Sequence, residues 1–457
     1  MFYKSTRGKV KGIKFKEAVM MGLAEDGGLL IPEEIPYFSS SDLIRLSALN
    51  YKELAFEIIS KFTDDIDGDT LKGIIEKSYS TFESDEVIPV VKKGDIYIAE
   101  IFHGPTYAFK DIALQFLGNL FEYILNESGE YLNIIGATSG DTGSAAIYGV
   151  RGKKNINIFI LHPKGKVSPV QELQMTTVSD KNVFNLAVDG TFDDCQSIVK
   201  EIFADVDFKK RHSLGAVNSI NWARILAQIV YYFYCYFRAA KGDEVNVVVP
   251  TGNFGNIFAG YFAKKMGLPI SKLILATNEN NILTRFINEG DYSIKDVKQT
   301  YSPSMDIQIA SNFERYLYYL YGKPETVVQK MDELKQYKRI KFTEEEIKKV
   351  QAEFASYSTI NEETLEIIRD FCEKYDYILD PHTACGVNAV YKLNLKGVNI
   401  CLSTAHPAKF YDAIYKAIGK YPEEPENIRK IKNLPKRVFE IENNTEKVKE
   451  FIKSKLN

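Results

Sequence analysis

The chain has 457 residues, of which 45% are hydrophobic and 26% are charged, and its formal net charge at pH 7 is -3. This length and composition are typical of a globular protein of roughly two to four domains. The near-neutral charge provides no broad basic surface, which argues against nucleic acid as the main partner, whereas a small anionic ligand needs only a local positive site.

The cysteines and apolar segments exclude several classes of protein. No cysteine pair has C-x-x-C spacing and the number is odd, so we predict reduced thiols, with neither a disulfide framework nor a metal site. The N-terminal residues lack the apolar core of a signal peptide. The longest apolar stretch, 225–237, is too short to span a bilayer. We therefore predict a soluble cytoplasmic protein with no membrane partner; the cysteines are Cys195, Cys235, Cys372, Cys385 and Cys401.

Residues 1–92 predict a mainly helical domain. Apolar residues recur at helical spacing over 14–24, a Gly- and Pro-rich turn follows at 25–36, and a second helical pattern covers 42–62.

From residue 93 onward short apolar strands alternate with helices, which predicts βαβ units and mainly parallel sheets with helices on both faces. We place one α/β domain at 93–215, a second at 216–425 and a helical tail at 426–457, and the smaller domain can be inserted within the larger. The expected strands are 95–102, 131–137, 155–163, 183–188, 244–250 and 272–277.

A glycine-rich loop, TGNFGN, follows the strand 244–250 and precedes a helix. Glycines allow close approach of a ligand, and the free N–H groups at a helix start bind phosphate. The loop fits neither the dinucleotide-binding nor the P-loop pattern, so we predict a phosphate site for another ligand. A tight turn without a ligand is the alternative. The loop residues are Gly252, Asn253, Phe254, Gly255 and Asn256.

A second loop, TSGDTGS, lies between the strand 131–137 and a helix, at the sheet edge where α/β folds bind ligands. Hydroxyl and backbone N–H groups together suit a carboxylate. Helix capping is the alternative, but capping needs fewer such residues. The polar residues are Thr138, Ser139, Asp141, Thr142 and Ser144.

Lys110, in the stretch HGPTYAFKD, precedes apolar residues at helical spacing and therefore lies near the start of a largely buried helix. Burial and the helix dipole both lower the pKa of an amine in this position. A partly neutral amine suits Schiff-base chemistry. On this stretch alone a solvated surface lysine is the favoured alternative.

The phosphate loop and Lys110 together point to pyridoxal 5'-phosphate (PLP), which needs a lysine, a phosphate site and a polar partner for its ring nitrogen. Ser403 and Thr404, at the end of a strand in NICLSTAHPAKF, supply hydroxyls that fit the third requirement. Ordinary capping of the turn after that strand is the alternative.

Eight stretches together resemble the threonine synthase family, PLP-dependent enzymes of fold type II, which are similar to the tryptophan synthase β subunit. They cover roughly residues 3 to 420, in the family's order. They are STRG, FKEAVMMGLAEDGGLLIPEEIP, FHGPTYAFKD, GATSGDTGSAA, HPKGKVSPVQELQM, NSINWARILAQIVYYF, VPTGNFGNIFAGY and STAHPAKF.

The resemblance implies a fold of two open, mostly parallel sheets flanked by helices, with an added helical N-terminal region. It implies that Lys110 binds PLP as a Schiff base and is the catalytic residue. Residues 252–256 would hold the cofactor phosphate, and Thr404 would face the pyridine nitrogen. The family often has aspartate where this chain has Asn256, a change that we expect to be tolerated. The expected substrate loop contains Ser139, Gly140, Asp141 and Thr142.

The implied reaction converts O-phospho-L-homoserine and water to L-threonine and phosphate. Arg224, with Asn218 nearby in sequence, is the candidate for the substrate phosphate, because arginine suits bidentate phosphate contacts. A surface arginine is an equally good interpretation from sequence. Lys164 and Lys166 are weaker candidates.

Two other functions are compatible with these residues. One is another fold type II lyase, such as a threonine dehydratase or an amino-phosphate phospholyase. The other is a non-catalytic, synthase-like protein that binds a phosphorylated amino acid, although the retained Lys110 argues against it. We expect a monomer or a homodimer.

Overall fold

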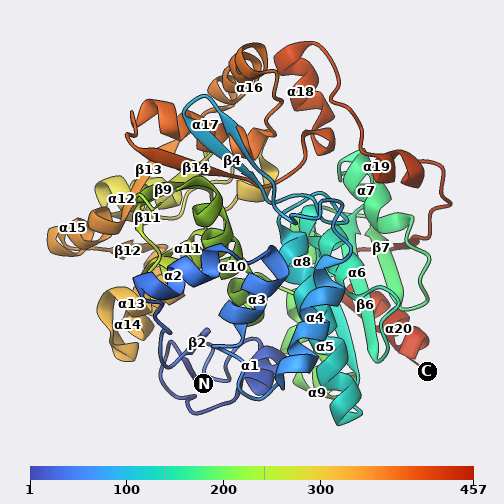
Figure 1. The fold of residues 1–457 in the computed structure, drawn as a ribbon. Coiled ribbons are helices and arrows are strands. Elements are labelled where there is room, and N and C mark those ends of the chain that lie inside the picture. Colours follow the sequence, from blue (N-terminus) through green and yellow to red (C-terminus); the bar gives the residue numbers. More distant parts are fainter. Residues whose placement is uncertain (139, 241, 457) are drawn as a thin grey trace. The chain divides into compact units, whose positions relative to one another are not determined.

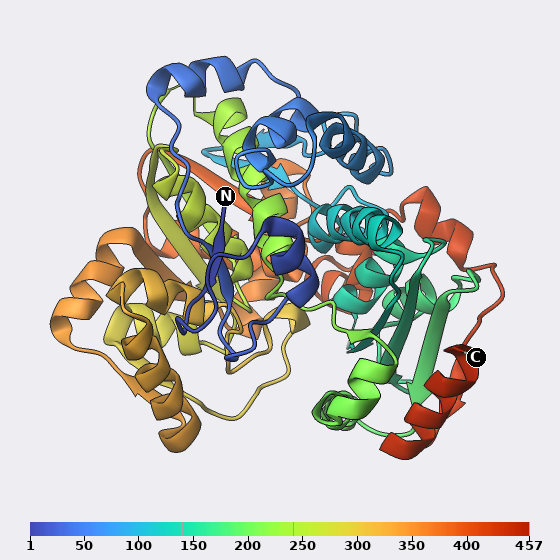
Figure 2. The ribbon, with the colours of Figure 1, turned by 90° about the horizontal axis from the view of Figure 1, so that it is seen from below.

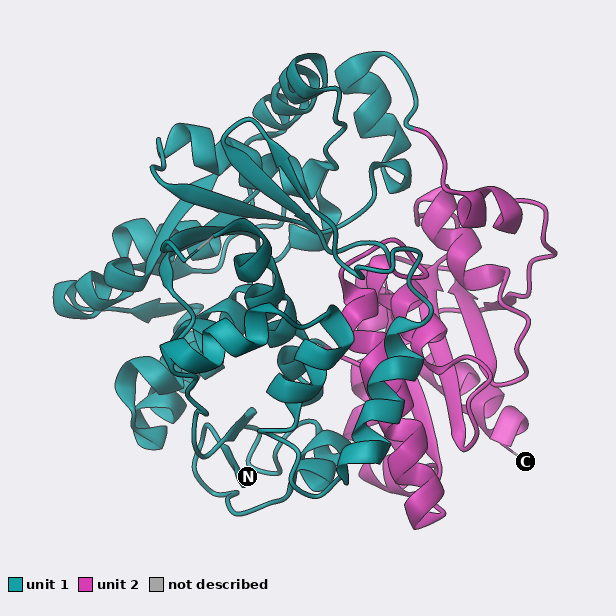
Figure 3. Cartoon of the chain, viewed as in Figure 1, with its two compact units in different colours: residues 1–103, 219–422 teal, residues 104–218, 423–457 magenta. Residues whose placement is uncertain are grey.

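The computed structural model describes residues 1–138, 140–240 and 242–456. The chain divides into two compact units (Figure 3): residues 1–103 with 219–422, and residues 104–218 with 423–457. The second unit is therefore an insertion in the first, completed by the C-terminal residues.

The first unit contains a six-stranded sheet with the order β13-β10-β9-β14-β4-β3. Its neighbouring strands are parallel, except that β3 and β4 are antiparallel. Val247, Val248 and Val249 of β9 are all buried, so both faces of the sheet are covered, as expected for a parallel sheet. The strands are β3 (Val90–Lys93), β4 (Ile96–Glu100), β9 (Val245–Pro250), β10 (Ile270–Thr277), β13 (Phe354–Ser358) and β14 (Val398–Ser403).

Helices surround this sheet, and two small antiparallel strand pairs complete the unit (Figure 1). The pairs are β1 (Tyr3–Ser5) with β2 (Leu30–Pro32) and β11 (Asp291–Ser293) with β12 (Arg339–Lys341). The helices are α1 (Phe15–Met21), α2 (Ser40–Ser47), α3 (Tyr51–Ile59), α4 (Gly68–Tyr79), α10 (Trp222–Ala239), α11 (Gly255–Lys265), α12 (Ile282–Glu289), α13 (Phe313–Tyr321), α14 (Pro324–Tyr337), α15 (Glu344–Glu353), α16 (Asn361–Tyr375), α17 (Pro381–Lys392) and α18 (Tyr411–Ile418), with short 3-10 turns η1 (Pro303–Met305) and η2 (Pro407–Lys409).

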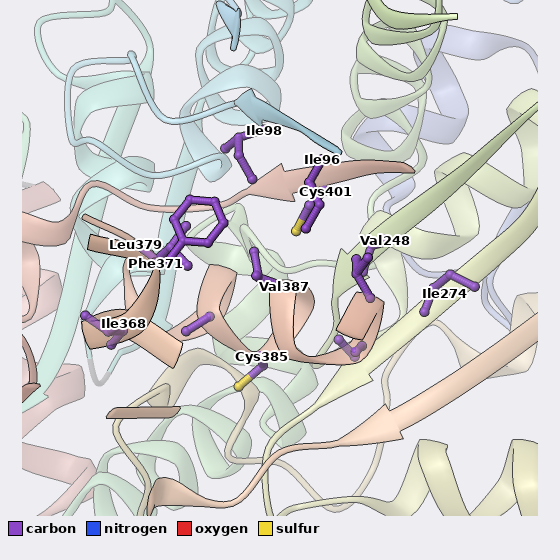
Figure 4. Close-up of a cluster of buried hydrophobic side chains, with 14 of the residues drawn as sticks. Ile96, Ile98, Val248, Ile274, Ile368, Phe371, Leu379, Cys385, Val387 and Cys401 are labelled. Carbon is purple, nitrogen blue, oxygen red and sulfur yellow. The ribbon is translucent and has the colours of Figure 1, made fainter. Parts of the chain in front are cut away.

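A core of buried side chains fixes α16 and α17 against one face of the sheet (Figure 4). Val248 of β9 and Cys401 of β14 pack in the same cluster as Phe371 of α16 and Val387 of α17. This packing sets the position of the N-terminus of α17, which follows Asp380.

The second unit contains a parallel five-stranded sheet with the order β15-β7-β6-β5-β8. Figure 2 shows its strands, with the C-terminal helix α20 in red beside them. The strands are β5 (Leu132–Ala137), β6 (Ile156–Pro163), β7 (Val183–Val188), β8 (Leu214–Gly215) and β15 (Phe439–Ile441). The helices are α5 (Lys110–Ser128), α6 (Asp141–Val150), α7 (Pro169–Thr176), α8 (Phe192–Ala204), α9 (Val206–Arg211), α19 (Glu426–Ile431) and α20 (Thr445–Leu456).

The predicted architecture of two mostly parallel sheets with a helical N-terminal region is confirmed, but the structure groups the predicted segments differently. The strand β4 belongs to the first unit because it pairs with β14. The tail joins the second unit because β15 extends its sheet alongside β7, and Val448 and Ile452 of α20 enter its core. Residues 1–92 belong with 219–422.

Two glycines allow α5 and α6 to pack at very short range in the second unit. A β-carbon at Gly118 of α5 would overlap the carbonyl oxygen of Gly149 in α6. A β-carbon at Gly149 would lie 2.5 Å from the carbonyl oxygen of Leu114. Because Lys110 begins α5 and Asp141 begins α6, this packing determines how those two residues approach each other.

We predict that Gly118→Ala lowers the free energy of unfolding of the second unit by about 1–3 kcal/mol, the usual cost of overpacking a core. Gly73→Ala is the matched control, because Gly73 lies in α4 with nothing near its missing β-carbon. That substitution should stabilise the protein by about 0.5–1 kcal/mol through helix propensity. Urea unfolding measures both, and an unchanged midpoint for Gly118→Ala would contradict the proposed tight contact.

Candidate active site

Lys110 is the first residue of α5 and is only 9% exposed. Its Nζ lies 3.6 Å from Oδ2 of Asp141, the first residue of α6. The buried position at a helix start was predicted. The carboxylate partner was not, and it acts against burial and the helix dipole, because a nearby anion favours the ammonium form of an amine.

Asp111 fixes the turn that precedes Lys110. Its carboxylate accepts hydrogen bonds from the backbone N–H of Thr106 at 2.8 Å and from the Thr106 hydroxyl at 2.7 Å. Gly104 has no room for a side chain, because a β-carbon there would lie 2.7 Å from Oδ2 of Asp111. Asp111 therefore holds the turn that precedes Lys110.

The second loop is held from within by Thr138. The Thr138 hydroxyl oxygen accepts from the backbone N–H of Gly140 at 3.1 Å and of Gly143 at 3.0 Å. Thr142 is half-buried in the first turn of α6. Ser139, a predicted substrate contact, lies outside the described residues.

Two buried glutamines of α7 hold these two loops. Nε2 of Gln171 donates to Oδ1 of Asp141 at 2.7 Å, and Nε2 of Gln174 donates to the carbonyl oxygen of Thr106 at 3.0 Å. Sequence reasoning missed both residues. The signal was a pair of glutamines three residues apart, on one face of a short helix.

In the first unit, the glycine-rich loop 252–256 connects β9 to α11 as predicted. Phe254 has a left-handed backbone (φ 61°), and its ring packs 5.7 Å from that of Phe313. Gly252 has no room for a side chain, since a β-carbon there would lie 2.7 Å from the carbonyl oxygen of Ser304. No described side chain caps the N-terminus of α11. Its backbone N–H groups and dipole therefore suit an anion.

Asn256 contributes a donor to the same loop. Its Oδ1 accepts from the hydroxyls of Tyr231 at 2.5 Å and Tyr232 at 2.8 Å. Its Nδ2 is buried and has no hydrogen-bond partner among the described residues. An aspartate could make the same two contacts but would lack this donor, so asparagine favours an anionic ligand here.

A second pair of residues that the sequence did not reveal anchors the loop. Nδ2 of Asn312 donates to the carbonyl oxygens of Ser219 and Asn253, at 3.1 Å each. Arg315 donates to Oδ1 of Asn312 and to the carbonyl oxygen of Ile220. The loop and the segment that leads into α10 are thus held together.

Arg224, in the first turns of α10, is a buried cation and not the surface residue that sequence also allowed; it is 4% exposed. Burial lowers the pKa of its guanidinium to about 10. Its Nε and Nη1 have no hydrogen-bond partner among the described residues. Because an unpaired buried charge is costly, this guanidinium is suited to an anionic ligand.

Ser403 and Thr404 lie at the carboxyl end of β14 and are both buried. The Ser403 and Thr383 hydroxyls are 3.0 Å apart, and the backbone N–H of Thr404 donates to the Thr383 oxygen at 3.4 Å. The strand end is therefore tied to α17.

Other sequence candidates lie at less specific positions. Asn218 is exposed, at the end of the inserted segment of the second unit. Lys164 and Lys166 are also exposed. His103, in the stretch HGPTYAFKD, lies 2.7 Å from a carboxylate oxygen of Glu100.

Three family models match the chain: threonine synthase N terminus over residues 2–79, pyridoxal-phosphate dependent enzyme over 89–402, and threonine synthase, C-terminal, over 383–452. The threonine synthase of Saccharomyces cerevisiae is 48% identical, over 99% of this chain and 98% of its own. The chain belongs to the threonine synthase family.

Solved structures of threonine synthases have the same fold as this chain. PLP-bound threonine synthase from Brucella melitensis matches with a TM-score of 0.97 and 42% identity, covering 100% of this chain and 99% of that one. The structure from Escherichia coli matches at 0.83 and 30% identity, over 99% and 100% of the two chains. The predicted family, fold type II, PLP cofactor and lyase class are thereby confirmed.

The residues of each unit fit this cofactor. The first unit offers the N-terminus of α11, without a side-chain cap, and the buried Nδ2 of Asn256, without a partner among the described residues; both are suitable for the cofactor phosphate. The second offers the buried amine of Lys110, which is suitable for a covalent bond to an aldehyde.

We predict that Gln171→Met weakens PLP binding by about tenfold, corresponding to the loss of a hydrogen bond worth about 1.5 kcal/mol. The substitution conserves volume but leaves Asp141, the partner of Lys110, less firmly held. Titration of cofactor-free protein with PLP measures the effect. Glu172→Met on the same helix is the control, since Glu172 pairs with Lys436 at the surface. Equal affinities in the two variants would contradict a role for Gln171.

Proposed function

We propose that this chain converts O-phospho-L-homoserine and water to L-threonine and phosphate, the last step of threonine synthesis. The match of both terminal segments to models specific to threonine synthases carries this proposal, because it separates the chain from other fold type II lyases. The buried, unpartnered Arg224 supports a substrate that bears a phosphate.

Lys110 is the residue to which PLP would be bonded, as a Schiff base. When bound, PLP supplies an electron sink that stabilises negative charge at the α-carbon of the substrate. The free amine of Lys110 would act as the general base that removes the α-proton of the substrate. The amine of Lys110 would then carry protons to and from the β- and γ-carbons of the substrate. Burial excludes water that would compete for these protons.

Phosphate leaves from the γ-carbon of the substrate and water adds at the β-carbon. Arg224 would neutralise the substrate phosphate and stabilise it as it leaves as a dianion, with Asn218 as a further candidate contact. A guanidinium without another anionic partner can give its full charge to this group.

The remaining assignments follow the loops described above. Residues 252–256 would bind the cofactor phosphate through backbone N–H groups and the Asn256 amide, and Thr404 would face the pyridine nitrogen. The loop 139–142 would bind the substrate carboxylate. Within it, the Asp141 carboxylate is already engaged by Lys110 and Gln171, so Thr142 and backbone groups are the better ligands.

We also propose a cytoplasmic location and a monomeric or homodimeric form. The five cysteines are all free, which supports a reducing compartment. Among the described residues, no helix is both long and apolar enough to cross a membrane.

The product of the reaction tests this function directly. Incubation of the purified, PLP-loaded protein with O-phospho-L-homoserine should release phosphate and threonine in equal amounts, measured by phosphate assay and chromatography. Formation of 2-oxobutyrate in place of threonine would favour another lyase activity, and no release of phosphate would favour a non-catalytic binding protein.

We predict that Arg224→Met raises KM for O-phospho-L-homoserine roughly ten- to hundredfold, since hydrogen bonds to charged groups contribute about 1.5–3 kcal/mol. The same variant should be more stable than the wild type without ligands, because it removes an unpaired buried charge. Steady-state kinetics and thermal unfolding measure the two effects.

Arg238→Met is the control for this prediction, since Arg238 is at the other end of α10 and contacts backbone carbonyls at the surface. A KM for Arg224→Met equal to that of the control would show that Arg224 does not bind the substrate phosphate.

A further inference from the structure

Asp380 immediately precedes α17 and is 1% exposed. Like an ordinary helix cap, its carboxylate accepts from the backbone N–H groups of His382 and Thr383. It also accepts from two side chains, Nδ1 of His382 at 2.9 Å and the hydroxyl of Thr383. No lysine or arginine among the described residues forms an ion pair with it. Asp380 therefore does more than a helix cap requires.

The contact between Asp380 and Thr383 fixes the direction of the hydrogen bonds at the end of β14. A carboxylate can only accept, so Thr383 must donate its single hydroxyl proton to Asp380. The Thr383 oxygen can then only accept from the Ser403 hydroxyl, 3.0 Å away. The proton of Ser403 is thus committed to Thr383. Thr404 is left as the hydroxyl of this pair that can donate to a ring nitrogen.

The contact between Asp380 and His382 connects Asp380 to the glycine-rich loop through Ser304. Because Nδ1 of His382 carries the proton donated to Asp380, its Nε2 is an acceptor, and it receives the backbone N–H of Ser304 at 3.2 Å. The carbonyl oxygen of Ser304 is the group that leaves no room for a β-carbon at Gly252. His382 is 3% exposed, so this chain of contacts is shielded from water.

We propose that Asp380 is a positioning residue for PLP, which sets the hydrogen-bond direction at residues 403–404 through Thr383 and supports the phosphate loop through His382 and Ser304. The inference rests on the proposed assignment of residues 252–256 and Thr404 to the cofactor. Both series of contacts, the one through Thr383 and the one through His382 and Ser304, lie within the first unit.

Asp380→Asn tests the direction of these hydrogen bonds. Asparagine is as good a helix cap as aspartate, so α17 is retained. Its amide, however, presents one donor where the carboxylate presents none. Facing Thr383, the amide sends the Thr383 proton to Ser403; facing His382, it forces the other tautomer, whose Nε2–H opposes the N–H of Ser304. We expect PLP to bind at least tenfold more weakly, with a shifted absorbance maximum.

A pair of Thr383 variants keeps the test decisive if Asp380→Asn folds poorly. Thr383→Ser retains the hydroxyl and should bind PLP as the wild type does. Thr383→Val has the same shape without the hydroxyl, and should shift the absorbance and weaken binding at least fivefold. The double variant Asp380→Asn with Thr383→Val should lose less PLP affinity than the sum of the two single losses, because both substitutions act on the contact between Asp380 and Thr383.

The control is Asp67→Asn, at the cap of α4 in the same unit, where the carboxylate accepts from the backbone N–H of Thr70. It should leave PLP affinity and absorbance unchanged. Wild-type affinity and absorbance in both Asp380→Asn and Thr383→Val would overturn the inference while leaving the proposed function intact. Failure of the wild-type protein to bind PLP would instead overturn the proposed function, and this inference with it.

Discussion

The structure of the second unit depends on keeping one lysine amine out of water. The Lys110 amine is buried at the start of a helix, where both burial and the helix dipole disfavour its charged form. The carboxylate of Asp141, 3.6 Å away, offsets this cost. A small displacement of either helix start would weaken this ion pair, so the pair benefits from rigid helix starts.

Several features of the second unit meet that requirement. Gly118 and Gly149 bring α5 and α6 into backbone contact, so that the helices cannot separate without losing the packing. The Asp111 carboxylate closes the turn before Lys110, and the glutamines of α7 hold the two loops from the side. In the first unit, Arg224 and the Nδ2 of Asn256 are buried donors that have no hydrogen-bond partner within 1–138, 140–240 and 242–456. Under the proposed function, these donors would be satisfied by the phosphate groups of the cofactor and the substrate.

The sequence predicted the position of a residue correctly where both its chemical type and its place at the end of a strand or helix could be read from the chain. The lysine at a helix start, the loop 252–256 and the hydroxyls at 403–404 each follow from residue type and from the end of a strand or helix. It failed where a residue acts through a partner far away in sequence. Asp141 beside Lys110, Asn312 beside Asn253 and Asp380 behind Ser403 depend on tertiary packing, which strand and helix patterns do not encode. The short strand β15 was likewise missed because three residues carry no periodic signal.

The central claim is that Lys110 is the residue to which PLP is bonded. Borohydride reduction of the PLP-loaded protein, followed by proteolysis and mass spectrometry, tests it most directly. We predict one phosphopyridoxyl group per chain, on the peptide that contains Lys110, and no incorporation into Lys110→Ala. Modification of a different lysine, or no modification of the wild-type protein, would contradict the account.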